Sequence, residues 1–223
     1  MRRPPAKHSV FFGVVEAMQR PGCFLCRLEQ QAVVQQLDAL LYECVNDPAL
    51  RSRLREGGGF CAAHGHLLLE MGDAMGVAIL FRDQVIDAAD QVSRPAGRAR
   101  GAETACPSCA TRDAARERHL ACFAEFGDDP AFREAVAGLV DLCLPHWRAI
   151  DRAARSSGLR NLLRETMEMR LAELRRDLDE FLRKQDHRFR GEPISDAEAR
   201  SWICAVQLRV GWTFPKHELL RRR

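Results

Sequence analysis

The sequence has little net charge and no long apolar run. Of its 223 residues, 34 are Lys or Arg and 31 are Asp or Glu, which leaves a net charge of +3. So weak a bias does not predict binding to nucleic acid or to a membrane surface. No segment approaches the roughly 18 consecutive apolar residues of a membrane-spanning helix, and Val10 to Val15 is too short for a secretory signal. We expect a soluble, cytoplasmic protein without a membrane partner.

The sequence also lacks the alternation of apolar and polar residues that is typical of β-strands. Apolar residues recur at helical spacing instead, as Leu28, Val33 and Leu37 illustrate. A chain of this length with 46% hydrophobic residues can bury a sizeable core. We predict an all-α fold with helical segments at Cys26–Val45, Ala62–Val92, Ala110–Phe126, Leu144–Asp186 and Ser195–Trp212.

Cysteine, by contrast, is frequent, and six of the nine cysteines belong to a pattern that occurs twice. Each copy holds a Cys-x-x-Cys pair followed by a Cys-x-x-His pair. The copies are 83 residues apart at the first pair and 82 at the second. Cysteines that serve only as small apolar residues would not reproduce both residue type and spacing. The sequence therefore predicts eight metal ligands: Cys23, Cys26, Cys61, His64, Cys106, Cys109, Cys143 and His146.

Three thiolates and one imidazole form a standard structural zinc site, with no position left for water or substrate. A Cys-x-x-His pair on a helix places both ligands on one face, because residues three apart are neighbours there. We predict two zinc ions per chain. The alternative is an iron–sulfur centre, since cysteine-rich sets also hold such clusters.

The spacing leaves open which pairs share an ion. Local sites would close each copy on itself, whereas crossed sites would join Cys23 and Cys26 to Cys143 and His146. Closing a loop of roughly 120 residues instead of roughly 35 costs only about 1 kcal/mol more. The matching spacing of the copies favours local sites, so that each copy would be a helical hairpin with its ends held by one ion.

The chain divides, on this interpretation, into two repeats and a C-terminal helical hairpin that pack as one compact unit. The linker between the repeats contains Pro95, Gly97 and Gly101 and no apolar run. In both repeats an Asp-Pro pair is expected to start a short helix. The predicted parts are residues 1–92, a linker at 93–105, residues 106–170, and the hairpin at 171–223.

Other reactive residues carry weaker signals. Cys44, Cys122 and Cys204 are expected to pack in helices, and His66, His119 and His187 to take surface, capping or supporting positions. A thioredoxin-type redox site would need a βαβ context that is missing. A Cys143–His146 catalytic dyad would leave the remaining cysteines without a role. Acidic residues interleave with the arginines of residues 148–164, which favours a solvated face over a nucleic-acid surface.

The motifs together resemble an uncharacterised bacterial family that is defined only as a domain of unknown function. The resemblance rests on Pro-Gly before Cys23, Gly-Phe before Cys61, Pro107, Leu142, and the segment Phe181-Leu-Arg-Lys-x-Asp-x-Arg-Phe-Arg with Glu192, Pro193 and Trp202. It extends from about Val10 to Gly211 and implies no activity. It does imply that the segment Phe181–Trp202 belongs to the same architecture as the ligand motifs.

Lys184, Asp186, Arg188 and Arg190 surround Phe189 in this segment. They either form a docking surface or make salt bridges that seat the terminal hairpin on the repeats, and we favour the salt bridges. The sequence as a whole predicts a metal-binding interaction or regulatory protein with an unidentified protein partner, and it favours a binding role over an enzymatic one. The alternatives are an iron–sulfur electron-transfer or redox-sensing protein, and a switch in which oxidation releases zinc and forms disulfides within each Cys-x-x-Cys pair.

Overall fold

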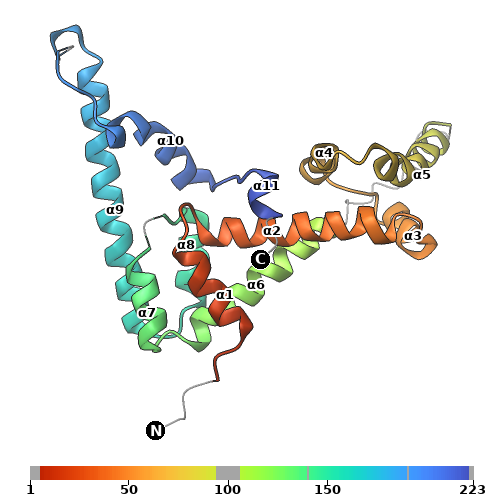
Figure 1. The fold of residues 1–223 in the computed structure, drawn as a ribbon, viewed down its shortest axis with the longest axis horizontal. Coiled ribbons are helices and arrows are strands. Elements are labelled where there is room, and N and C mark those ends of the chain that lie inside the picture. The colour runs from red at the N-terminus through yellow and green to blue at the C-terminus, as the bar shows by residue number, and fades with distance from the viewer. Residues whose placement is uncertain (1–5, 94–105, 140, 190, 221–223) are drawn as a thin grey trace. The chain divides into compact units, whose positions relative to one another are not determined.

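A computed structural model describes residues 6–93, 106–139, 141–189 and 191–220. These residues form helices, turns and loops without a strand, which confirms the all-α prediction. The chain divides into two compact units, each built from both halves of the sequence (Figure 1). The first unit comprises residues 1–28 and 116–213, and the second comprises residues 29–115 and 214–223.

This division does not follow the predicted repeats. Each unit contains parts of both copies, and the predicted C-terminal hairpin region, 171–223, contributes to both units because the chain changes unit after Thr213. Nearly all of the predicted linker, together with Arg190 and the terminal arginines, lies outside the described residues.

The first unit contains the start of α2 (Phe24–Ala39) and the end of α6 (Pro107–Glu125), together with five complete α-helices and a 3-10 turn. The complete elements are α1 (Ser9–Met18), α7 (Pro130–Ala137), α8 (Leu144–Ala153), α9 (Ser157–Lys184), η2 (His187–Phe189) and α10 (Asp196–Val210). The long helix α9 packs against α7, α8 and α10, and α1 packs against α7.

Phenylalanines form much of the core of this unit. Phe123, Phe126 and Phe132 are fully buried, and the ring of Phe132 meets that of Phe123 edge to face at 5.0 Å between centroids. Phe11 of α1 meets Phe126 at 4.8 Å. Such edge-to-face pairs add to the free energy gained by burying the rings. They fix α1 and α7 against the end of α6.

The charged segment after α9 is held by ion pairs inside the α9–α10 hairpin. Lys184 Nζ lies 2.8 Å from Glu198 at the start of α10 and also donates to the carbonyl oxygen of Pro193. Arg183 pairs with Glu192, and its guanidinium lies 4.6 Å from the ring centroid of Phe189. These contacts join the two arms of the hairpin to each other, whereas the predicted salt bridges were to seat the hairpin on the repeats. Ser195 and Glu198 form a capping box at the start of α10.

The second unit contains the rest of α2 (Phe24–Ala39) and the start of α6 (Pro107–Glu125). Its complete elements are the π-helical turn η1 (Leu40–Cys44), α3 (Pro48–Glu56), α4 (Ala62–Met71), α5 (Ala74–Val92) and α11 (Lys216–Leu219). The aliphatic core joins Leu37 and Leu40 to Leu54 of α3, Leu68 of α4 and Leu80 of α5. Two ion pairs, Arg51–Asp83 and Arg55–Asp87, bind α3 to α5.

Local sequence signals placed most helices correctly but missed two breaks and two helices. Asp47 and Asp129 each cap a helix with Pro in its first turn, as predicted. The predicted helix Ala62–Val92 is interrupted at Gly72, whose φ of 80° ends α4, and Asp73 caps α5. The predicted helix Leu144–Asp186 is interrupted before Ser156, which caps α9. Helices α1 and α11 were not predicted.

Candidate metal centres

The eight predicted ligands form two clusters, and each cluster combines the two copies of the repeat. The first cluster contains Cys23, Cys26, Cys143 and His146, and the second contains Cys61, His64, Cys106 and Cys109. Within each cluster the ligand atoms all lie within 4.8 Å of one another. The eight predicted residues therefore form two four-ligand groups. The prediction that the two motifs of one copy share an ion was wrong.

The reason for the crossed pairing lies in the helix that follows each Cys-x-x-Cys pair. Leu68, one turn after His64, packs in the core with Leu37 of α2. Leu37 follows Cys23 by fourteen residues, and at 1.5 Å per residue a helix of that length rises about 21 Å. Ligands of one ion must lie within a few ångströms of each other. Cys61 and His64 thus belong to the second unit with Leu37 and Leu68, whereas Cys23 belongs to the first.

Contacts inside each unit show how the copies meet. In the first unit the start of α2 lies beside the end of α6, where the rings of Phe24 and Phe123 stack at 5.9 Å. In the second unit the start of α6 lies beside the end of α2, where Ser108 Oγ donates to Gln36 Oε1 at 2.8 Å. The Cys-x-x-Cys pair at the start of one helix thus meets the Cys-x-x-His pair of the other copy.

Helix starts position the ligands in both clusters. Cys143 is the N-cap of α8 and Cys61 is the N-cap of α4, so the histidine three residues later lies in the first turn on the same side. Cys23 comes just before α2, after Gly22, whose φ is 86°. The N–H of Gly22 donates to Asp141 at 3.0 Å, and this contact fixes the loop of Cys23 against the loop of Cys143.

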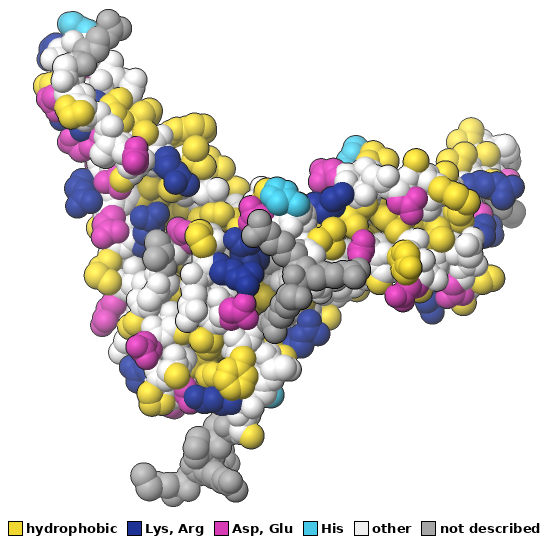
Figure 2. Space-filling model, in the orientation of Figure 1, with side chains coloured by type: hydrophobic (Ala, Val, Ile, Leu, Met, Phe, Trp, Pro, Cys, Tyr) yellow, Lys and Arg dark blue, Asp and Glu magenta, His cyan; other side chains and the backbone are white. Residues whose placement is uncertain are grey.

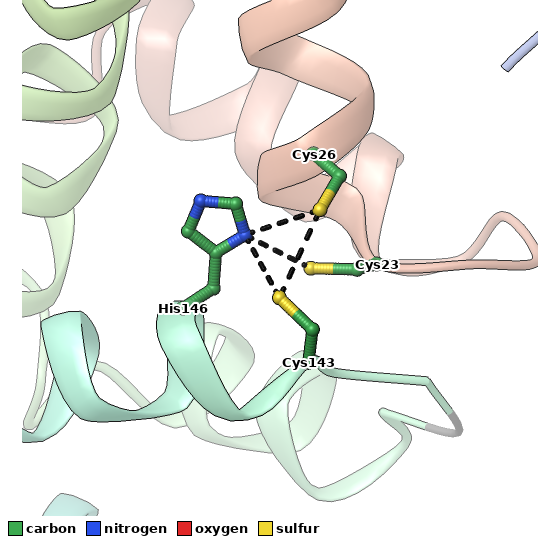
Figure 3. Close-up of side chains that lie close together, drawn as sticks. All are labelled: Cys23, Cys26, Cys143 and His146. Atoms are coloured by element: carbon green, nitrogen blue, oxygen red, sulfur yellow. Dashed lines mark hydrogen bonds between the residues drawn. The ribbon is translucent and has the colours of Figure 1, made fainter. Parts of the chain in front are cut away.

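The distances in the first cluster match those expected around a single tetrahedral ion. His146 Nδ1 lies 3.3 Å from the Sγ atoms of Cys23 and Cys26 and 3.2 Å from Cys143 Sγ. Figure 3 shows this nitrogen directed at the three sulfurs. Metal–ligand lengths of about 2.3 Å for sulfur and about 2.0 Å for nitrogen give tetrahedral edges of about 3.8 Å and 3.5 Å. The Sγ atoms of Cys26 and Cys143 are 3.8 Å apart.

The second cluster has the same geometry. His64 Nδ1 lies 3.2 Å from Cys61, 3.3 Å from Cys106 and 3.5 Å from Cys109. The Sγ atoms of Cys61 and Cys109 are 3.7 Å apart, whereas a disulfide has an S–S length of about 2.05 Å. Both clusters thus have the donor types and the spacing that a structural zinc ion takes.

The clusters differ in exposure. All four ligands of the first are buried, and Cys23 and Cys143 have no exposed surface. In the second cluster His64 and Cys106 are buried, whereas Cys61 and Cys109 are half-buried. All four residues of the first cluster are thus buried, whereas two cysteines of the second remain partly accessible.

In each cluster, one cysteine has a raised pKa and another has a lowered pKa. Burial raises the pKa of Cys23, while hydrogen bonds from Cys23 and Cys26 lower the pKa of Cys143. Burial raises the pKa of Cys109 to about 11. At Cys61 burial also acts to raise the pKa, but hydrogen bonds from the backbone of α4 and from the other two thiols of the cluster together lower it. Burial lowers the pKa of His64, which favours the neutral imidazole that a metal requires.

The C-terminal end of α10 supplies a contact that the sequence did not predict. The backbone N–H of Trp212 donates to Cys26 Sγ at 3.4 Å. Gly211 has a φ of 99°, and a Cβ atom there would lie 3.2 Å from Cys26 Sγ. Asp141 was also missed, although it joins Gly22 to Arg170 of α9. The motif spacing contains no signal for either contact, because both join distant segments.

The remaining cysteines lie outside both clusters, as predicted. Cys122 is buried, and burial followed by the charge of Glu125 raises its pKa to about 11. Cys44 and Cys204 are half-buried, so their packing is looser than predicted. His66 lies beside the second cluster in the wall of a groove, and His187 is exposed next to Asp186. His119 belongs to α6 and to neither cluster.

Comparison with known proteins finds a match to a family model and one relative, neither of which has a known activity. Residues 10–100 match the model of DUF6062, a family of unknown function. The predicted resemblance to an uncharacterised domain family is confirmed. The chain is also 26% identical, over 208 residues, to an uncharacterized 23.9 kDa protein in the xynA 3' region of Caldicellulosiruptor sp. (strain Rt8B.4). The alignment covers 89% of this chain and 99% of that relative. No solved structure matches the chain significantly.

None of the helices in the described residues combines the length and the apolar character that crossing a bilayer requires. On the face shown in Figure 2, Lys and Arg side chains are interspersed with Asp and Glu along α9.

Proposed function

We propose that the protein is a cytoplasmic interaction or regulatory module whose two structural zinc ions join the two copies of its repeat. The observation that carries this proposal is the pair of four-ligand groups with tetrahedral spacing, each drawn from both copies. Three thiolates and an imidazole are soft donors, which suit zinc better than magnesium or calcium. A closed set of four protein ligands supports a structural role over a catalytic one.

Each ion fixes two distant segments. The first joins the start of α2 to the start of α8, 117 or more residues along the chain, and the second joins α4 to the start of α6. A structural zinc contributes about 10–16 kcal/mol in small zinc-finger peptides, although part of that free energy is used to order the ligands. The ions therefore dominate the stability of the junctions and make the fold depend on metal supply.

The spacing also bears on the iron–sulfur alternative. In a cluster, the four protein ligands are distributed over two or four irons, so they do not all surround one ion and some of them lie farther apart. Four ligand atoms within 4.8 Å of one another support a single ion instead. A single iron ion bound by the same four ligands would give similar ligand spacing. Elemental analysis, and not the spacing, therefore distinguishes zinc from a single iron.

The test is elemental analysis together with an absorption spectrum of tag-free protein purified without oxygen. We expect two zinc ions per chain and no visible absorption. Iron with visible absorption would replace the proposal by the redox alternative, and a metal-free, folded protein would overturn it. For the partner, we expect a zinc-loaded chain to be cross-linked to a discrete protein in cell extract, and a chelated chain to lose that product.

A further inference from the structure

The second metal centre is reached from an apolar groove, whereas the first is covered by the chain. The groove has a volume of about 290 Å³, and its wall includes the ligand Cys61. Its other sides come from α4 and α5 and from the residue before Cys61; they include Phe60, Gly65, Leu69 and Phe81. The rings of Phe60 and Phe81 stack at 6.2 Å and form one apolar wall.

The first centre has no such approach. Its four ligands are buried, and the turn at Gly211 and Trp212 lies directly on the sulfur of Cys26. The N–H of Trp212 donates to that sulfur, so it both covers the thiolate and offsets part of its charge. An incoming ligand would first have to displace this turn.

We propose that the second centre is the exchangeable one, where a soft ligand enters through the groove and replaces a protein thiolate on the ion. This inference rests on the proposed zinc sites. The ligand class is a thiol or an aromatic nitrogen chelator with an apolar body, because the groove is lined mainly by apolar side chains. The half-buried sulfurs of Cys61 and Cys109 are the ligands it can displace.

The exchange involves no oxidation. An incoming thiol binds zinc through sulfur and releases its proton, while the zinc–sulfur bond to Cys61 or Cys109 breaks and the freed thiolate takes up a proton. The ion keeps its charge throughout. Repetition of this step transfers the ion from the protein to the incoming ligand.

The experiment follows zinc loss from the full, zinc-loaded chain after addition of excess 1,10-phenanthroline, an apolar chelator. We expect two phases of one zinc each, the first severalfold faster. Iodoacetamide is added when the fast phase ends, and modified cysteines are identified by mass spectrometry. We expect Cys61, Cys106 and Cys109 to be modified while Cys23, Cys26 and Cys143 stay protected. Loss in one phase, or the reverse labelling, would overturn the proposal.

The route is tested by filling the groove. In Gly65→Leu the new side chain would extend from α4 toward Phe81, whose ring edge lies 4.0 Å from a Cβ built there. We expect the fast phase to slow severalfold with zinc stoichiometry unchanged. Gly13→Leu is the matched control, because Gly13 is also helical and a Cβ there would meet nothing within 4 Å.

A second variant covers the case in which Gly65→Leu fails to fold. Leu69 is 64% exposed, so Leu69→Ala should fold and widen the groove. We expect its fast phase to be faster than that of the unmodified chain. An unchanged rate would exclude the groove as the route.

The experiment separates failure of the proposed function from failure of the present inference. If the protein binds no zinc at all, the proposed function fails. If it binds two ions that leave together, only the present inference fails.

Discussion

The backbone N–H of Trp212 lies 3.4 Å from the sulfur of Cys26, a residue 186 positions earlier in the chain. This contact joins the end of α10 to the first metal centre. The chain then continues into the second unit, where the N–H of Phe214 donates to Gln30 and Lys216 donates to the carbonyl oxygens of Glu70 and Met71. The segment after α10 therefore depends on both units for its hydrogen bonds.

Pairs of cysteine substitutions should distinguish crossed from local sites. The double variant Cys23→Ser with Cys143→Ser removes two ligands of the same cluster, so we expect it to keep one zinc per chain. Cys23→Ser with Cys61→Ser removes one ligand from each cluster, so we expect it to keep none. Elemental analysis of gel-filtered protein gives the stoichiometry. Local sites would produce the opposite result for the two variants.

Gly211→Ala should destabilise the protein. With a φ of 99° and a ψ of 173°, Gly211 has a conformation that glycine adopts readily and residues with a Cβ rarely adopt. An added Cβ would also lie 3.2 Å from Cys26 Sγ. We expect a loss of about 1–3 kcal/mol in the free energy of unfolding, measured with urea on zinc-loaded protein. Gly191→Ala is the control, because a Cβ there meets nothing within 4 Å. Equal midpoints for both variants would contradict the strain at Gly211.

Glu198→Gln should weaken the α9–α10 hairpin in a pH-dependent way. The hydrogen bond from Lys184 lowers the pKa of Glu198, and the backbone N–H of Ser195 lowers it further. A carboxyl group with a lowered folded-state pKa stabilises fully above its unfolded pKa, and that contribution is lost as pH falls through the folded value.

We therefore expect wild type to be more stable than Glu198→Gln at neutral pH, with the difference fading in acid. Urea midpoints of the two proteins, measured from pH 7 downward over the range in which elemental analysis finds both zinc ions bound, test this expectation. The other hairpin carboxylates, Glu180 and Glu192, titrate in both proteins, so the difference isolates Glu198. A difference that stays constant over this range would rule out the ion pair as its source.

Leu37→Ala should destabilise the second unit through a cavity in its core. Leu37 is fully buried among aliphatic side chains from α3, α4 and α5. Leu-to-Ala changes at such sites cost about 2–5 kcal/mol, which thermal unfolding of the zinc-loaded protein would report. Leu182→Ala is the comparison, since Leu182 is 65% exposed and its truncation should cost little. Similar losses in both variants would argue against the packing described.

The sequence by itself determined the fold class and the identity of the candidate ligands. Helical periodicity, Asp-Pro helix starts and the Ser195–Glu198 capping box each involve residues that are close in the sequence, so the sequence alone reveals them. The repeat of Cys-x-x-Cys and Cys-x-x-His likewise selected eight residues that the structure brings into two groups. The breaks at Gly72 and Ser156 were missed because the apolar periodicity continues past them.

Only the tertiary structure decided which ligands share an ion. The entropy of loop closure grows with the logarithm of loop length, so it distinguishes near from distant pairing by only about 1 kcal/mol. The packing of Leu68 with Leu37 decides the matter, because it holds the Cys-x-x-His pair many residues along α2 from Cys23. The contact of Trp212 with Cys26 arises in the same way. Both depend on how rigid helices pack, which spacing along the sequence does not encode.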